Sequence, residues 1–253
     1  MTSEKSAACG MWLRSFHEAP ESRTRLLCLP HAGGSASFYL PVSAALSPRI
    51  EVLAAQYPGR QDRRSEPAVG TIAELADRVH EVVSELDDRP LAIFGHSMGA
   101  ILGFELARRL EADGRPAAVL FASGRRGPRT HRCELVHQRD DDGLVAELKN
   151  LSGTDAALLD DEELLRMILP AVRNDYRAIE TYERPPGAPL STPIVALIGD
   201  DDPKSSVNEA KAWAEETTGD FSLRVLPGGH FYLASQQRAV LETITERVRA
   251  YTA

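Results

Sequence analysis

The sequence predicts an α/β fold built on a mostly parallel, doubly wound sheet. Short segments that are apolar nearly throughout recur along the chain, at residues 26–29, 52–57, 91–94, 119–122, 194–198 and 222–226. Longer stretches with apolar residues at helical spacing separate most of these segments. Strands of this kind belong in a parallel sheet that helices cover on both faces. The alternation of strand and helix implies right-handed crossovers.

The predicted helices span residues 72–86, 100–110, 208–217 and 239–251. Thr71 stands directly before the first of them and Glu74 follows three residues later. A threonine in that position, with an acidic residue three places on, is typical of a capped helix start.

The alternation stops between residues 125 and 192, which we call the inserted segment. It carries runs of acidic residues and helical patterns at 144–148 and 164–179, but no convincing strand. Because it is far longer than an ordinary connection, we expect a helical lid inserted within a single domain that spans residues 1–253. An ordinary pair of crossover helices is the alternative.

The amino-acid composition argues against several classes of protein function. A net charge of −8 over 253 residues gives little attraction to nucleic acids or to anionic membrane surfaces. Three cysteines, Cys9, Cys28 and Cys133, form neither a disulfide framework nor a zinc spacing. The N-terminus lacks the apolar core of a signal peptide, and no apolar run approaches the roughly 18 residues of a spanning helix. We expect a cytoplasmic monomer without a metal and without nucleic-acid or membrane partners.

Residues 95–99 read GHSMG, a GxSxG pattern. A buried strand precedes it and a helix follows it, which is the setting of the nucleophile elbow in the α/β-hydrolase fold. Two glycines allow a sharp turn that presents Ser97 above the sheet edge, and the helix directs its N-terminal amides toward the site. We therefore predict Ser97 as a nucleophile. The alternative is a serine that only caps a helix.

A serine hydroxyl needs a base to take its proton, and in this fold an acid and then a histidine follow it along the chain. His230 follows the last predicted strand in a glycine-containing loop, so it is the predicted base. His131 and His137 fall inside the inserted segment with no strand beside them.

The acid is expected on the loop after strand 194–198, where residues 199–203 read GDDDP. Asp202 is the preferred candidate because Pro203 fixes the backbone just after it. Asp200 is the runner-up, or an acceptor that orders the loop.

Negative charge on a reacting carbonyl oxygen requires two backbone N–H donors. One is expected from Met98, the residue after the nucleophile, and the other from Ala32. Ala32 belongs to residues 31–34, HAGG, which we call the glycine loop. We expect His31 to shape this loop. The GxGxxG spacing of dinucleotide-binding proteins is absent there.

The motifs together resemble one family. They are LPHAGG at 29–34, YPGRQDR at 57–63, FGHSMG at 94–99, GDDDP at 199–203 and GGHF at 228–231. In this order they resemble the type II thioesterases that accompany modular polyketide synthases and nonribosomal peptide synthetases. The resemblance covers nearly the whole chain, although Asp201 stands where the family is variable.

The resemblance implies a hydrolase that removes acyl groups from the phosphopantetheine arm of acyl or peptidyl carrier proteins, clearing stalled or wrongly primed short chains. It implies the triad Ser97, Asp202 and His230, with Ala32 and Met98 as oxyanion donors. No cofactor is implied, because the phosphopantetheine belongs to the substrate. Two other functions share the motifs: a general carboxylesterase or lipase, and a catalytically silent binding module.

Carrier proteins tend to be acidic, so a basic rim is expected at the entrance. One candidate cluster is Arg60, Arg63 and Arg64, and the other is Arg125, Arg126, Arg129 and Arg132. The alternative for each is a solvated surface arginine. Residues 167–169 of the inserted segment either line an acyl chamber or pack helices together.

Overall fold

A seven-stranded sheet runs through the described part of the chain in the order β1-β3-β2-β4-β5-β6-β7. The structure, a computed structural model, describes residues 10–151 and 161–252. The strands are β1 (Leu13–Arg14), β2 (Arg25–Leu29), β3 (Glu51–Ala55), β4 (Leu91–His96), β5 (Val119–Ser123), β6 (Ile194–Gly199) and β7 (Phe221–Leu226). All neighbouring pairs are parallel except β1 with β3. The predicted α/β fold with a mostly parallel sheet is confirmed.

The six predicted strands correspond to β2 through β7, with ends that differ by at most two residues. Strands β2 and β5 are buried along their whole length, which explains their continuous apolar character. Strand β1 was not predicted, because two residues carry no periodic signal.

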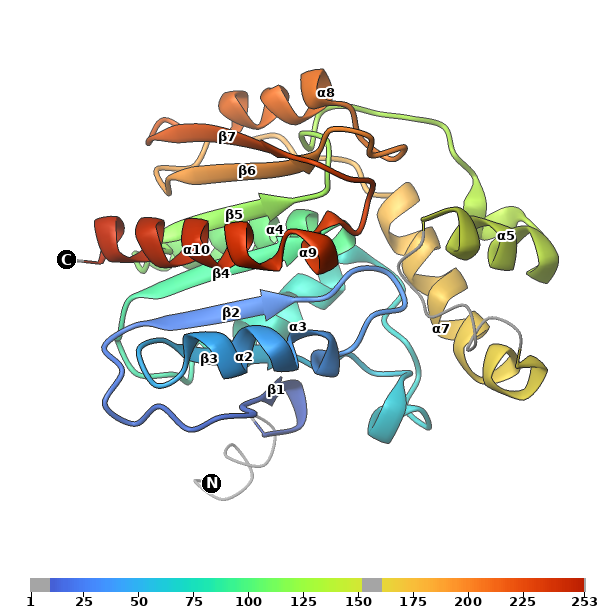
Figure 1. The fold of residues 1–253 in the computed structure, drawn as a ribbon, viewed down its shortest axis with the longest axis horizontal. Helices are drawn as coiled ribbons and strands as arrows, with labels where there is room; N and C mark the ends of the chain where they lie inside the picture. The colour runs from blue at the N-terminus through green and yellow to red at the C-terminus, as the bar shows by residue number, and fades with distance from the viewer. Residues whose placement is uncertain (1–9, 152–160, 253) are drawn as a thin grey trace.

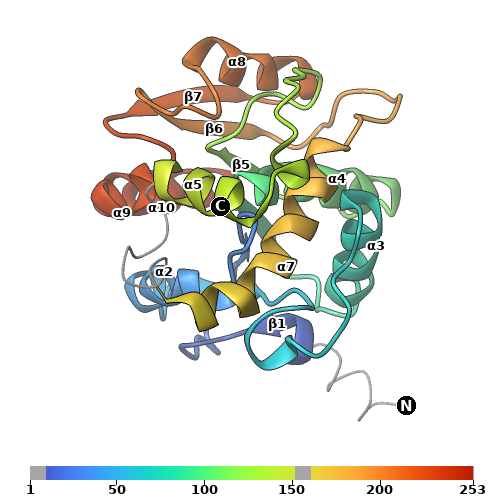
Figure 2. The same cartoon turned by 90° about the vertical axis from the view of Figure 1, so that its right-hand side faces the viewer.

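Helices cover both faces of the sheet (Figures 1 and 2). One face carries α2 (Leu40–Leu46), α9 (Tyr232–Ser235) and α10 (Gln237–Tyr251). The other carries α3 (Ile72–Val83) and α4 (Met98–Ala112), with α8 (Val207–Lys211) beside β6 and β7. Short 3-10 helices are η1 (Ala36–Tyr39), η2 (Gln61–Arg63), η3 (Val136–Gln138) and η4 (Ala212–Glu216).

One predicted helix start is confirmed, one predicted helix is divided in two, and one short helix was not predicted. The Thr71 hydroxyl accepts a hydrogen bond from the Glu74 amide at 3.2 Å, so the predicted cap of α3 is confirmed. Residues 208–217, expected as one helix, form α8 and then η4. Helix α2 was missed because seven residues are too few to establish a helical period.

The sheet separates two apolar cores. One joins strand residues such as Leu27 and Ile93 to α3 and α4. The other joins Leu26 and Phe94 to α2 and α10. Alternate residues of one strand therefore enter opposite cores, as the pleat of a strand requires.

Between β5 and β6 the described residues form η3, α5 (Asp141–Leu151) and α7 (Glu162–Glu180). These helices lie over the carboxyl ends of the strands (Figures 1 and 2). The last turn of α7, with Ala178 and Ile179, packs into the core beside α4. The remainder of α7 forms a separate apolar cluster with α5 and η3. One end of α7 is thus held by the core.

The strand order reverses between β2 and β4. The chain passes from β2 outward to β3, then returns to place β4 on the other side of β2 and continues outward to β5. In open α/β sheets, ligands bind beyond the carboxyl ends of the strands at such a reversal. The glycine loop follows β2 and Ser97 follows β4, so both meet at this point. Among the described residues no helix is long and apolar enough to cross a membrane.

We expect the central strands to dominate stability. Leu120 in β5 is fully buried, whereas Leu40 in α2 exposes 46% of its surface. Leu120→Ala should lower the free energy of unfolding by about 2–5 kcal/mol, because the site cannot fully collapse around the missing atoms. Leu40→Ala should change it by less than about 0.5 kcal/mol. Urea unfolding followed by circular dichroism measures both, and equal losses would contradict this assignment of the core.

Candidate active site

Ser97 sits at a sharp turn between β4 and α4. Its backbone has φ 56° and ψ −114°, a left-handed value that is rare outside glycine. Its amide donates to the Ser123 carbonyl at 2.8 Å, which ties the turn to the end of β5. Such strain costs of order 1–3 kcal/mol and persists only where the surroundings enforce it.

Steric crowding at the turn leaves no room for a Cβ atom at Gly95 or Gly99. A Cβ on Gly95 would lie 1.9 Å from the Gly99 carbonyl oxygen. A Cβ on Gly99 would lie 2.0 Å from the Leu29 carbonyl oxygen at the end of β2. Strand β2 and the first turn of α4 therefore approach closer than any side chain allows.

His230 and Asp202 form a buried pair. The Nδ1 atom of His230 lies 3.0 Å and 2.9 Å from the two carboxylate oxygens of Asp202. Their side chains are 2% and 0% exposed. The Lys204 amide also donates to Asp202, at 2.8 Å, and orients its carboxylate. Because Nδ1 faces the carboxylate, Nε2 is the ring nitrogen left free for other chemistry.

The neighbouring aspartates have other partners. The Asp200 carboxylate accepts a hydrogen bond from the Gly228 amide at 2.8 Å, so it connects the loop after β6 to the loop before His230. Asp201 is exposed, and its amide donates to the Gly228 carbonyl. The structure thus brings Asp202 against His230 and uses Asp200 to order the loop.

Two further imidazoles surround the site. His96 and His230 have ring centroids 5.0 Å apart, and His96 and His31 lie 6.0 Å apart. Burial, with His230 and Arg60 nearby, lowers the pKa of His31 to about 3. Burial also lowers the pKa of His96 well below its usual value. Both rings are therefore neutral and weakly basic, and His230 alone of these three is paired with a carboxylate.

The glycine loop is clamped to the inserted segment. Asp175 of α7 accepts from the Gly33 amide at 2.8 Å and pairs with Arg60 at 2.9 Å. Arg60 also donates to the Gly34 carbonyl at 3.2 Å. Gly33 has φ 75°, and a Cβ there would lie 2.6 Å from Val172 of α7. The loop that carries Ala32 is therefore held by a buried ion pair.

This geometry corrects the predicted docking surface. Arg60, Arg63, Arg125 and Arg126 are all less than a tenth exposed, so none of them is a surface residue. Arg63 pairs with Glu66 and lies over the ring of Trp12, because the chain folds back there. A buried guanidinium cannot meet a docking partner.

Two of the three remaining cluster members keep more exposure but form ion pairs. The side chains of Arg129 and Arg132 are 49% and 34% exposed and pair with Glu216 and Glu209. Arg64 is exposed and lines the groove described below.

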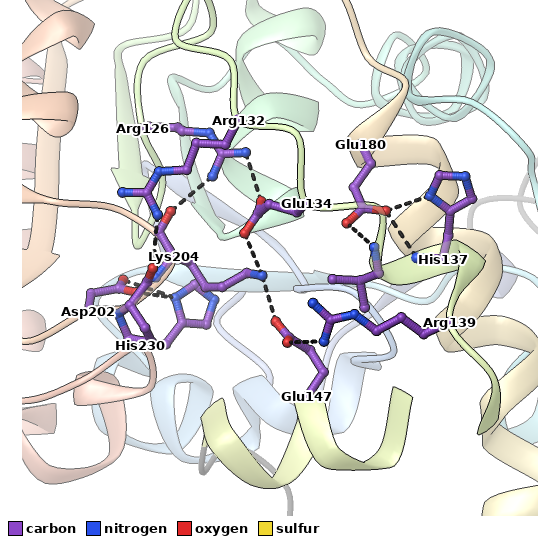
Figure 3. Close-up of polar contacts among 12 residues, drawn as sticks. Arg126, Arg132, Glu134, His137, Arg139, Glu147, Glu180, Asp202, Lys204 and His230 are labelled. Atoms are coloured by element: carbon purple, nitrogen blue, oxygen red, sulfur yellow. Dashed lines mark hydrogen bonds and ion pairs between the residues drawn. The ribbon is translucent and has the colours of Figure 1, made fainter. Parts of the chain in front are cut away.

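A chain of ion pairs runs beside His230 and Asp202 (Figure 3). Arg126 pairs with Glu134 at 2.9 Å, Glu134 with Lys204 at 2.7 Å and Lys204 with Glu147 of α5 at 2.6 Å. Since Lys204 lies two residues after Asp202, this series of ion pairs joins the Asp202 loop to α5. The sequence singled out Arg126 only as a docking candidate. Glu134, Glu147 and Lys204 were not predicted, because no local pattern pairs Lys204 with acids so far away along the chain.

Ser97, Ala32 and His230 line one small cavity of about 30 Å³, roughly the space of one water molecule. A groove of about 550 Å³ adjoins it and shares His31, Ala32 and Leu148 with it. Met167 and Ile168 of α7 line the groove, while Leu169 packs in the cluster of α5 and α7. The groove and the cavity at Ser97 thus share part of their walls.

The fold is that of the α/β hydrolases. The thioesterase domain family matches residues 24–248, so the chain belongs to that family and is a hydrolase that acts on thioesters. The resemblance drawn from the sequence is therefore confirmed.

Three proteins that are similar to this chain are also named as thioesterases. A probable cadicidin biosynthesis thioesterase of Streptomyces griseus is 55% identical over 245 residues, covering 97% of this chain and 67% of the relative. Thioesterase PikA5 of Streptomyces venezuelae is 48% identical over 241 residues, covering 94% and 86%. The solved structure of the type II thioesterase BorB from the borrelidin biosynthetic cluster has a TM-score of 0.89 and 51% identity, covering 94% of this chain and 97% of that one.

The buried ion pair between Arg60 and Asp175, which holds the glycine loop, is expected to stabilise the fold. Asp175→Asn should lower the free energy of unfolding by about 3–5 kcal/mol, because it leaves Arg60 buried without a counter-charge. Asp141→Asn is the matched control, since Asp141 pairs with Arg173 while its side chain is 73% exposed. That change should have a much smaller effect. Urea unfolding measures both, and a mild effect at Asp175 would mean that the pair does not hold the loop.

Proposed function

We propose that this chain is a type II thioesterase that hydrolyses short acyl groups from the phosphopantetheine arm of acyl or peptidyl carrier proteins, editing stalled or misprimed synthase modules. The observation that carries the proposal is that His230, which pairs with Asp202, lines the same cavity as Ser97. Relatives named for cadicidin, PikA5 and borrelidin biosynthesis support the pathway class.

The proposed reaction uses Ser97 as the nucleophile. His230 Nε2 takes the hydroxyl proton as the Ser97 oxygen attacks the thioester carbonyl, and Asp202 stabilises the imidazolium. The carbon–sulfur bond breaks, and the arm leaves as a thiol once it receives that proton. Water, deprotonated by His230, then hydrolyses the acyl-serine and releases the acid. No metal or redox step enters this reaction.

The proposed oxyanion donors are the amides of Ala32 and Met98. Met98 is the first residue of α4, so its amide lies at the positive end of the helix. Ala32 lines the cavity, next to the clamped Gly33. A rigid donor pair stabilises developing negative charge without reorganising during the reaction.

The groove supports a route for the arm. Its wall contains the apolar residues Phe38, Met167 and Ile168, and it shares Ala32 with the cavity that Ser97 lines. A groove beside that cavity offers space for a flexible arm with an acyl thioester at its tip. Arg64 and Arg129 stay candidates for contact with an acidic carrier protein, because both keep exposed surface.

The first test is mass spectrometry of carrier proteins loaded with acetyl, propionyl or butanoyl groups. The wild-type protein should return each to the free thiol form, and Ser97→Ala should slow this at least about 10³-fold, because the nucleophile is lost. Oxygen esters of the same acids are the comparison substrates. Faster cleavage of the esters would favour a general esterase, and failure of a fluorophosphonate to label Ser97 would favour a binding module.

The second test separates the two aspartates. Asp202→Asn should lower kcat about 10³–10⁴-fold, because an amide no longer selects the required tautomer of His230. Asp200→Asn is the control, since among residues 10–151 and 161–252 the Asp200 carboxylate accepts one hydrogen bond, from the Gly228 amide. We expect it to lower kcat by less than about tenfold, consistent with one lost structural hydrogen bond. Steady-state kinetics with one acyl thioester decide this, and the reverse order would assign the acid to Asp200.

A further inference from the structure

Arg64 is an exposed cation in the wall of the groove of about 550 Å³ beside the cavity of Ser97. It follows η2, and it lines the groove but not the cavity. Among residues 10–151 and 161–252, its guanidinium forms no ion pair and no hydrogen bond. The N–H donors of this side chain are therefore free to bind a ligand in the groove.

The acidic residues next to Arg64 in the sequence pair with other arginines. Asp62 pairs with Arg14, and Glu66 pairs with Arg63 at 2.6 Å. The Arg63 side chain is also buried, whereas that of Arg64 lies at the surface of the groove. Although the whole chain has a net charge of −8, Arg64 thus gives this part of the groove wall a positive charge that neither acid pairs with.

Polar side chains line the same groove as Arg64. They are Ser35, Ser37 and Gln61. The Gln61 side-chain amide donates to the Ser37 hydroxyl at 2.9 Å, and the hydroxyl oxygens of Ser35 and Ser37 lie 2.9 Å apart. The two hydroxyls carry two protons, and the hydrogen bond between them uses one, so the other can be donated to a ligand. A guanidinium and a hydroxyl donor in one wall suit an anionic group with several acceptor oxygens.

The rest of the groove wall has a different character. Met167, Ile168 and Val172 of α7 are apolar, and Ala32 belongs to both the groove and the cavity of Ser97. A phosphopantetheine arm is divided in the same way, with a phosphate at one end, an aliphatic and amide body, and the thioester at the other end. A thioester placed at Ser97 leaves the phosphate for the part of the groove that the cavity does not share, which includes Arg64.

We propose that Arg64, together with the hydroxyls of Ser35 and Ser37, binds the phosphate of the phosphopantetheine arm. This inference rests on the proposed function and assigns a binding site to the end of the arm that does not react. A guanidinium binds two phosphate oxygens at once, which a single point charge does not. Because the phosphate is remote from the thioester carbonyl, the contact stabilises the bound substrate and the transition state equally. It therefore lowers KM and leaves kcat unchanged.

The experiment compares the propionyl thioesters of pantetheine and of phosphopantetheine, which differ only in the phosphate. For the wild type, KM should be about 3–10-fold lower for the phosphorylated thioester at equal kcat, as expected for an exposed ion pair with bidentate hydrogen bonds. Arg64→Gln should remove this difference by raising KM for the phosphorylated thioester alone. Arg64→Lys should retain part of it, because the charge stays while the bidentate geometry is lost. Added salt should reduce the wild-type difference.

Arg166→Gln is the matched control, since the Arg166 side chain on α7 is 79% exposed and lines neither the groove nor the cavity. It should leave the wild-type difference in KM intact. Equal KM values for the two thioesters in the wild type, an unchanged difference in Arg64→Gln, or the same loss in Arg166→Gln would overturn the inference. So would an effect of Arg64→Gln that is confined to propionyl-carrier protein, which would assign Arg64 to acidic side chains of the carrier. Failure of the wild type to hydrolyse any of these thioesters, the carrier-bound one included, would instead overturn the proposed function.

Discussion

The site depends on one close backbone approach, between the carbonyl of Leu29 at the end of β2 and the first turn of α4 at Gly99. Only a glycine fits there, and the same approach holds Ser97 in its left-handed conformation. It also brings the turn after β4 against the loop after β2. The nucleophile candidate and the glycine loop are therefore neighbours because their strands are neighbours, at the point where the strand order reverses.

Several charged side chains around the candidate site form buried ion pairs. Arg60 and Asp175 lie 115 residues apart in the chain, yet together they connect the glycine loop to α7. Lys204 connects the Asp202 loop to α5 through Glu147. The inserted segment is thus joined to the loops that carry the reactive groups by charge as well as by apolar packing. Movement of α5 would have to break an ion pair next to Asp202.

Three imidazoles lie around Ser97, and their surroundings differ. Burial keeps His31 and His96 neutral and weakly basic. His230 differs from both because a carboxylate faces its Nδ1 atom. The environment, rather than the residue type, therefore distinguishes His230 from its neighbours.

The sequence by itself determined strands β2 to β7, the turn at Ser97 and the order of the candidate residues along the chain. Apolar runs and glycine spacing are local, because a buried strand and a turn without Cβ atoms must be encoded where they occur. Asp202 could be preferred over Asp200 from Pro203, but only the structure placed it against His230. Four arginines were expected on the surface, and tertiary structure alone decided that they are buried: Arg60, Arg63, Arg125 and Arg126. The partner of Arg60, Asp175, lies 115 residues further along the chain, and no local pattern records which side chains packing will bring together.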